Sequence, residues 1–66
     1  MKYALYYRIE DGRLETEIAE NAKDRDIRID VLSMFRMYTD ACWCKIYASG
    51  EYGKRNLIIG KLENCL

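Results

Sequence analysis

The three cysteines are the residues best suited to metal or redox chemistry. Cys42 and Cys44 lie two residues apart, so in a strand both thiols point to one side, and Cys65 follows much later. A structural zinc site takes four ligands, commonly from CxxC-type pairs, and redox pairs are also usually CxxC. We therefore expect Cys42 and Cys44 to be small core residues, with no metal and no cofactor. The odd cysteine count also disfavours a disulfide framework.

The chain contains no histidine, which removes the commonest general base and the commonest zinc ligand. Nucleophile pairs of the Ser-His and Cys-His kinds are therefore impossible within this sequence. Carboxylates are plentiful, but none forms a recognisable catalytic pair with another. The sequence predicts a non-catalytic protein.

Aromatic and basic residues alternate along two segments that favour strands. If both segments lie in one sheet, we expect one outer face to carry Tyr6, Arg8, Trp43, Lys45 and Tyr47. Trp, Tyr and Arg are enriched at the centres of protein interfaces, so this face is a candidate partner-binding surface. Such a face could also stack unpaired bases. Glu15 and Glu17 are expected on the same face, where they would repel phosphates.

The segment 49–56 reads as a loop that connects two strands. It contains Gly50 and Gly53, followed by Lys54 and Arg55, and superficially resembles a phosphate-binding loop. The GxxxxGK[ST] spacing is missing, and no helix follows to direct amide groups at a phosphate. We expect a hairpin loop in which Lys54 and Arg55 contact a partner.

The segment Asp24–Asp40 is expected to form the only helix. On a helical wheel, an apolar stripe about 100° wide contains Ile27, Val31, Met34, Phe35 and Tyr38. Asn21 and Asp24 are both candidates for the N-cap. A rival interpretation is a short strand, because Ile27, Ile29 and Val31 alternate with charged residues, but it leaves the later apolar residues unexplained.

If the stripe faces the sheet, the opposite side of the helix is a second candidate binding surface. Its members are Arg25, Arg28, Ile29, Leu32 and Arg36. This apolar patch with a basic border would suit a larger protein or a second copy of the chain, although scattered exposed aliphatic residues are also ordinary on protein surfaces.

Strands are expected before and after the helix. Asp11-Gly12 is a strong signal for a two-residue hairpin turn. Core residues of the first hairpin would be Leu5, Tyr7, Ile9, Leu14 and Ile18, with Cys44 and Ile46 from the third strand. The four expected strands are 2–9, 13–19, 42–48 and 57–62. The predicted fold is α+β: a ββαββ chain with a four-stranded, mostly antiparallel sheet and one helix packed on one face.

Length and charge limit the function further. Sixty-six residues form one small domain, and eleven basic residues balance eleven acidic ones. Zero net charge gives no general attraction to nucleic acid or to anionic membranes. Neither a membrane span nor a signal peptide is evident, so we expect a cytoplasmic protein. We expect a stoichiometric inhibitor or adaptor of a larger protein complex, such as a phage or mobile-element anti-defence protein; the alternative is a single-stranded nucleic-acid binder.

Overall fold

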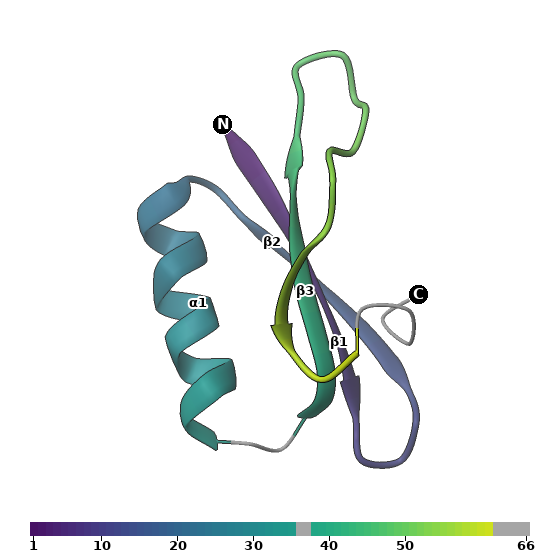
Figure 1. Cartoon of the computed structure of the whole chain (residues 1–66). Helices are drawn as coiled ribbons and strands as arrows, with labels where there is room; N and C mark the ends of the chain where they lie inside the picture. The colour runs from purple at the N-terminus through teal and green to yellow at the C-terminus, as the bar shows by residue number, and fades with distance from the viewer. Residues whose placement is uncertain (36–37, 62–66) are drawn as a thin grey trace.

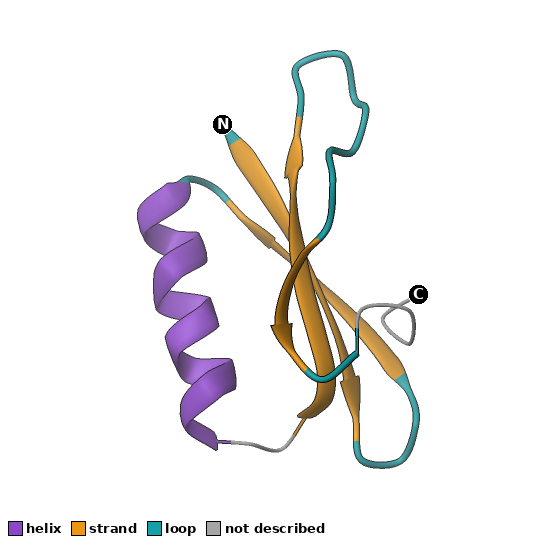
Figure 2. Cartoon of the chain, viewed as in Figure 1, coloured by secondary structure: helices purple, strands orange, loops and turns teal. Residues whose placement is uncertain are grey.

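The computed structural model describes residues 1–35 and 38–61. The chain forms one four-stranded antiparallel sheet with α1 across one of its faces, as Figure 1 and Figure 2 show. The strand order is β2-β1-β3-β4. In sequence, the elements are β1 (Lys2–Ile9), β2 (Leu14–Ala19), α1 (Ala22–Phe35), β3 (Tyr38–Ile46) and β4 (Asn56–Ile59). The predicted ββαββ fold is confirmed.

The first hairpin differs from the prediction by one residue. Ile9 N donates to Arg13 O at 3.0 Å and Gly12 N donates to Ile9 O at 2.9 Å, so three residues form the loop. Gly12 adopts a φ of 89°, as a three-residue loop of this kind requires. The predicted two-residue turn is wrong. Because side chains alternate, a register shift of one residue moves every side chain of β2 to the other face.

That shift decides which residues of β2 meet the helix. Leu5 pairs with Glu17 and Tyr3 with Ala19, so the helix side of β2 carries Glu15, Glu17 and Ala19. Leu14 and Ile18, which were predicted in the core, are instead 36% and 42% exposed.

The third strand is also turned over relative to the prediction. It pairs with β1 so that Leu5 lies opposite Trp43 and Tyr7 opposite Ala41. Trp43 therefore lies on the helix side, and Cys44, predicted to face the helix, lies on the other side. The strand begins at Tyr38, inside the segment predicted as helix, because Tyr38 and Asp40 pair with the end of β1.

The helix begins two residues earlier than predicted, and its N-cap is Asn21. The Asn21 Oδ1 atom accepts from Asp24 N at 2.8 Å, and Asp24 Oδ2 accepts from Glu20 N at 3.2 Å. These two bonds satisfy amide groups at the start of the helix, in the manner of a capping box.

The helix faces the sheet with the side predicted to be outermost. Leu32 is 3% exposed and belongs to the core, with Ile29 packed against it, whereas Ile27, Val31 and Met34 are exposed. The prediction that Ile29 and Leu32 lie on an outer binding surface is wrong. The core cluster on the helix side of the sheet is Leu5, Ala19, Leu32 and Ala41, with Tyr3, Tyr7, Tyr38 and Trp43 packed against it.

Gly60 marks the end of β4. Its φ is 78°, and a Cβ at this position would collide with Thr39 O and with the Asp40 side chain. Only a glycine therefore fits this close approach to β3. The strand therefore ends at Ile59, earlier than the predicted end at residue 62, which itself lies outside the described residues.

Candidate functional site

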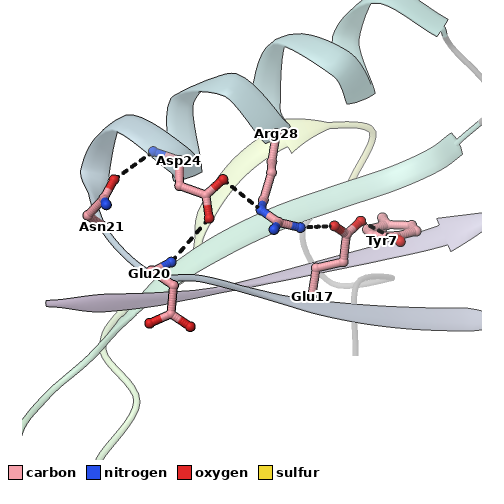
Figure 3. Close-up of polar contacts among 6 residues, drawn as sticks. All are labelled: Tyr7, Glu17, Glu20, Asn21, Asp24 and Arg28. Carbon is pink, nitrogen blue, oxygen red and sulfur yellow. Dashed lines mark hydrogen bonds and ion pairs between the residues drawn. The ribbon is translucent and has the colours of Figure 1, made fainter.

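A polar network joins α1 to the sheet, and Figure 3 shows its members. Arg28 donates from Nη1 to Glu17 Oε1 and from Nε to Asp24 Oδ1, the latter at 3.2 Å. Tyr7 Oη donates to the other Glu17 oxygen at 2.6 Å. Burial and this hydrogen bond to a carboxylate raise the pKa of Tyr7. Arg28 was predicted on the outer face, but it fixes the orientation of the helix on the sheet.

Arg25 makes the second polar contact between helix and sheet. Its Cζ lies 4.6 Å from the centre of the Tyr3 ring and 4.5 Å from that of Trp43. The two rings meet edge to face, with centroids 5.6 Å apart. Arg25 also donates from Nε and Nη2 to Asp26 Oδ1, at 3.0 and 2.8 Å. A guanidinium held over two aromatic rings gains cation–π attraction, so Arg25 anchors the first turn of the helix.

The connection between β3 and β4 extends beyond the sheet, at the end of the molecule where α1 begins (Figure 1). Three backbone hydrogen bonds order this connection. Gly50 N donates to Tyr47 O at 2.9 Å, Tyr47 N to Glu51 O at 2.9 Å, and Gly53 N to Lys45 O at 2.8 Å. An isolated bridge pairs Ile46 with Tyr52. The connection therefore continues the hairpin as an ordered projection.

The helix side of this hairpin is hollowed. A recess of about 320 Å³ is lined by Tyr3, Arg25, Trp43, Lys45, Tyr47, Lys54 and Asn56. Lys45 Nζ lies 5.7 Å from the centre of the Tyr47 ring. The Asn56 side chain is held in place because its Nδ2 donates to Lys54 O at 3.0 Å and to Trp43 O at 3.4 Å. Three cations and three aromatic rings thus meet in this recess.

The opposite side of the hairpin has a second recess of about 390 Å³. It is lined by Tyr6, Cys44, Tyr52, Gly53, Lys54 and Arg55. Arg55 Cζ lies 5.9 Å from the centre of the Tyr6 ring. Burial is the main cause that raises the pKa of Tyr6 and of the Cys44 thiol, so both groups are neutral at pH 7. The recess therefore takes its charge from Lys54 and Arg55.

We call the two recesses and the loop between them the hairpin surface. No carboxylate is among the residues that line either recess, whereas Arg25, Lys45, Lys54 and Arg55 are. Of the nearby carboxylates, Glu17 pairs with Arg28 and Glu15 with Arg13 at 3.1 Å, and Glu51 is exposed in the loop but lines neither recess. A chain with zero net charge thus carries a locally positive, aromatic surface.

Most residues predicted as binding residues gather at the hairpin surface, although not as one face of the sheet. Trp43, Lys45 and Tyr47 line the helix-side recess, Tyr6 and Arg55 line the other, and Lys54 lines both. Arg25, predicted on the outer helix face, joins them. Arg8 does not: its Nη1 donates to Gly12 O at 2.8 Å, in the turn after β1. Arg36 lies outside the described residues.

Sequence reasoning missed Tyr3, Tyr52 and Asn56 as lining residues. Tyr3 shares the β1 alternation with Leu5 and Tyr7, which indicated the core and hid its contact with Arg25. Tyr52 lies in a loop with no periodic pattern. No sequence signal pointed to Asn56, whose role depends on a contact across two strands.

Of the two described cysteines, Cys44 lines the recess beside Tyr6, and Cys42 lines neither recess. Cys42 and Cys44 are both buried, as predicted; Cys44 is a free thiol, and Cys42 is disulfide-bonded. The disulfide at Cys42 goes against the expectation, drawn from the odd cysteine count, that disulfides are disfavoured in this chain. Cys65 lies outside the described residues. Within residues 1–35 and 38–61, no three potential metal-ligating side chains of the His, Cys, Asp or Glu types come together.

No protein-family model matches the chain, and neither the curated proteins nor the solved structures compared with it give a match. In the part of the chain that the structure describes, no helix combines the length and the apolar composition needed to cross a membrane. The hairpin surface is therefore the feature of the molecule that points to a function.

Proposed function

We propose that the chain is a non-catalytic protein-binding module that docks its hairpin surface onto an acidic region of a larger protein. The observation that carries this proposal is the gathering of Arg25, Lys45, Lys54 and Arg55 around aromatic rings on both sides of one projecting hairpin. Arginine, tyrosine and tryptophan are the residue types enriched at interface hot spots.

The form of the hairpin supports a role in occupying a cleft. Its backbone is already ordered by hydrogen bonds and by the bridge between Ile46 and Tyr52, so little conformational entropy is lost on binding. A preorganised projection of this kind suits a cytoplasmic stoichiometric inhibitor or adaptor. An anti-defence protein of a phage or mobile element, which blocks a host complex, is one protein of this type.

The experiment is an affinity purification from cells that express the tagged chain, with matched charge reversals. The hairpin variant carries Lys54→Glu and Arg55→Glu. The control carries Lys23→Glu and Lys61→Glu, which change the net charge equally but lie outside both recesses. The proposal expects a stoichiometric partner that the wild type and the control retain and the hairpin variant loses. A partner retained equally by all three, or no partner at all, contradicts the proposal.

A second candidate function is single-stranded nucleic-acid binding through the same surface. One observation favours it: Glu17, expected to repel phosphates, is neutralised by Arg28 and hydrogen-bonded to Tyr7. Binding of an oligothymidylate that weakens as salt rises, and that Trp43→Ala and Tyr47→Ala abolish, supports this function. The absence of any salt-dependent oligonucleotide binding excludes it.

A further inference from the structure

The two recesses of the hairpin surface are neighbours, because Lys54 lines both. Arg25 and Lys45 supply further positive charge on the helix side, and Arg55 supplies it on the other side. Asp26 accepts two of the hydrogen bonds that the Arg25 guanidinium can donate, from Nε and from Nη2. The remaining cations have no carboxylate among the lining residues. Each recess is therefore suited to accept one negative group.

Four of the five aromatic rings that line the recesses, all but Tyr52, have a cation beside them. Arg25 lies against Tyr3 and Trp43, Lys45 against Tyr47, and Arg55 against Tyr6. A nucleic-acid base would have to displace a cation to stack on the same ring face, at the cost of the cation–π contact. A carboxylate has no such conflict, since it pairs with the cation where it lies and gains a charge-assisted hydrogen bond.

We infer that the partner contributes an extended acidic peptide segment, which crosses the hairpin at Lys54 and places one carboxylate in each recess. This inference rests on the proposed function and adds the chemistry of the partner. Volumes of about 320 and 390 Å³ accommodate one or two side chains each. A probe segment with two acidic residues three positions apart spans about 10 Å, since an extended chain advances about 3.3 Å per residue.

Trp43 provides the readout, because it is the only tryptophan in the chain and lines the helix-side recess. The probe is a capped eight-residue peptide with two glutamates three positions apart, titrated against the intact protein at low and at moderate salt. We expect a saturable change in tryptophan emission whose apparent affinity falls as salt rises. The same peptide with glutamines in place of the glutamates should give no saturable change.

Two variants locate the binding. Lys54→Gln should lower the affinity for the glutamate peptide by about tenfold, which is the effect of losing one charge-assisted contact. Lys23→Gln should leave this affinity unchanged. Circular dichroism spectra that match the wild type are required of both variants, to show that they are folded. The inference is overturned if the glutamate peptide gives no saturable change, if the glutamine peptide binds equally well, or if an eight-residue oligothymidylate binds more tightly than the glutamate peptide.

The purified partner separates this inference from the proposed function. If the glutamate peptide displaces the partner from the wild type, both are supported. If a partner depends on Lys54 and Arg55 but the peptide neither binds nor displaces it, the acidic-segment inference is wrong and the protein-binding function stands. If the peptide binds but no cellular partner is recovered, the proposed function is wrong and the recess chemistry stands.

Discussion

Replacing Leu32 by alanine tests the orientation of the helix on the sheet. Leu32 is 3% exposed and belongs to the core cluster with Leu5, Ala19 and Ala41. Truncation of a buried leucine to alanine costs about 2–5 kcal/mol, which includes the cavity left behind. Because this core is a single layer between one helix and one sheet, neighbours can partly close the space, and we expect about 2–3 kcal/mol. For a domain of this size, that loss lowers Tm by about 10–20 °C.

Met34→Ala and Val31→Ala are the matched controls. Both residues belong to the apolar stripe that the sequence assigned to the core, yet they are 73% and 44% exposed. Each truncation should therefore cost less than about 1 kcal/mol. The assay is urea denaturation followed by circular dichroism, compared at equal m values. A cost above about 2 kcal/mol for Met34→Ala together with a cost below about 0.5 kcal/mol for Leu32→Ala would refute the observed orientation.

Three further predictions concern the network, the pH dependence and a glycine. The double-mutant cycle of Glu17→Gln and Arg28→Met should give a coupling free energy of about 0.5–1 kcal/mol in urea denaturation, since both side chains are partly exposed, and zero coupling contradicts the contact. The folded-state pKa of Tyr7 is raised above the ordinary value of 10.0. The contribution of the neutral Tyr7 phenol to the free energy of unfolding is therefore complete below pH 10 and is lost as pH rises beyond it. Denaturation at pH 8 to 11 should show a shallower decline for Tyr7→Phe than for the wild type, and identical slopes contradict the shift. Gly60→Ala should destabilise the fold far more than Gly50→Ala, because both have positive φ but only at Gly60 does a Cβ meet atoms of β3. Equal melting temperatures for these two variants would contradict the close approach.

The architecture could be predicted from the sequence because strong local signals agree. Asp11-Gly12 marks a turn, and the long polar-apolar pattern after Asn21 marks a helix, so the ββαββ order follows. The faces of the elements could not be predicted in the same way. A loop of three residues in place of two reverses every side chain of β2, and both loops contain the same Asp11-Gly12 dipeptide.

The prediction of which helix face meets the sheet was wrong for a related reason. The sequence pattern ranks faces by apolar content, and by that measure Ile27, Val31 and Met34 form the better stripe. The sheet presents Glu17 and the Tyr3 and Trp43 rings to the helix, and Arg28 and Arg25 match them. Polar contacts between α1 and the sheet therefore determine which face of the helix packs inward. The apolar periodicity of the helix sequence contains no information about those contacts.

The candidate site was partly predictable. Alternation along β3 correctly grouped Trp43 with Lys45, and the loop composition indicated Lys54 and Arg55. The recesses themselves depend on contacts between distant elements. Arg25 comes to the helix-side recess from α1, and Lys54 comes from the segment that leads into β4. Local spacing therefore identified the residue types but could not place them around common cavities.

Amide hydrogen exchange of the chain, with and without its purified partner, shows directly whether the hairpin surface is the binding site. Protection on binding should be concentrated in residues 43–56, on the hairpin surface, with little change in the part of α1 around Ile27 and Val31. Protection concentrated in α1 or along β2, with residues 43–56 unchanged, would contradict this prediction.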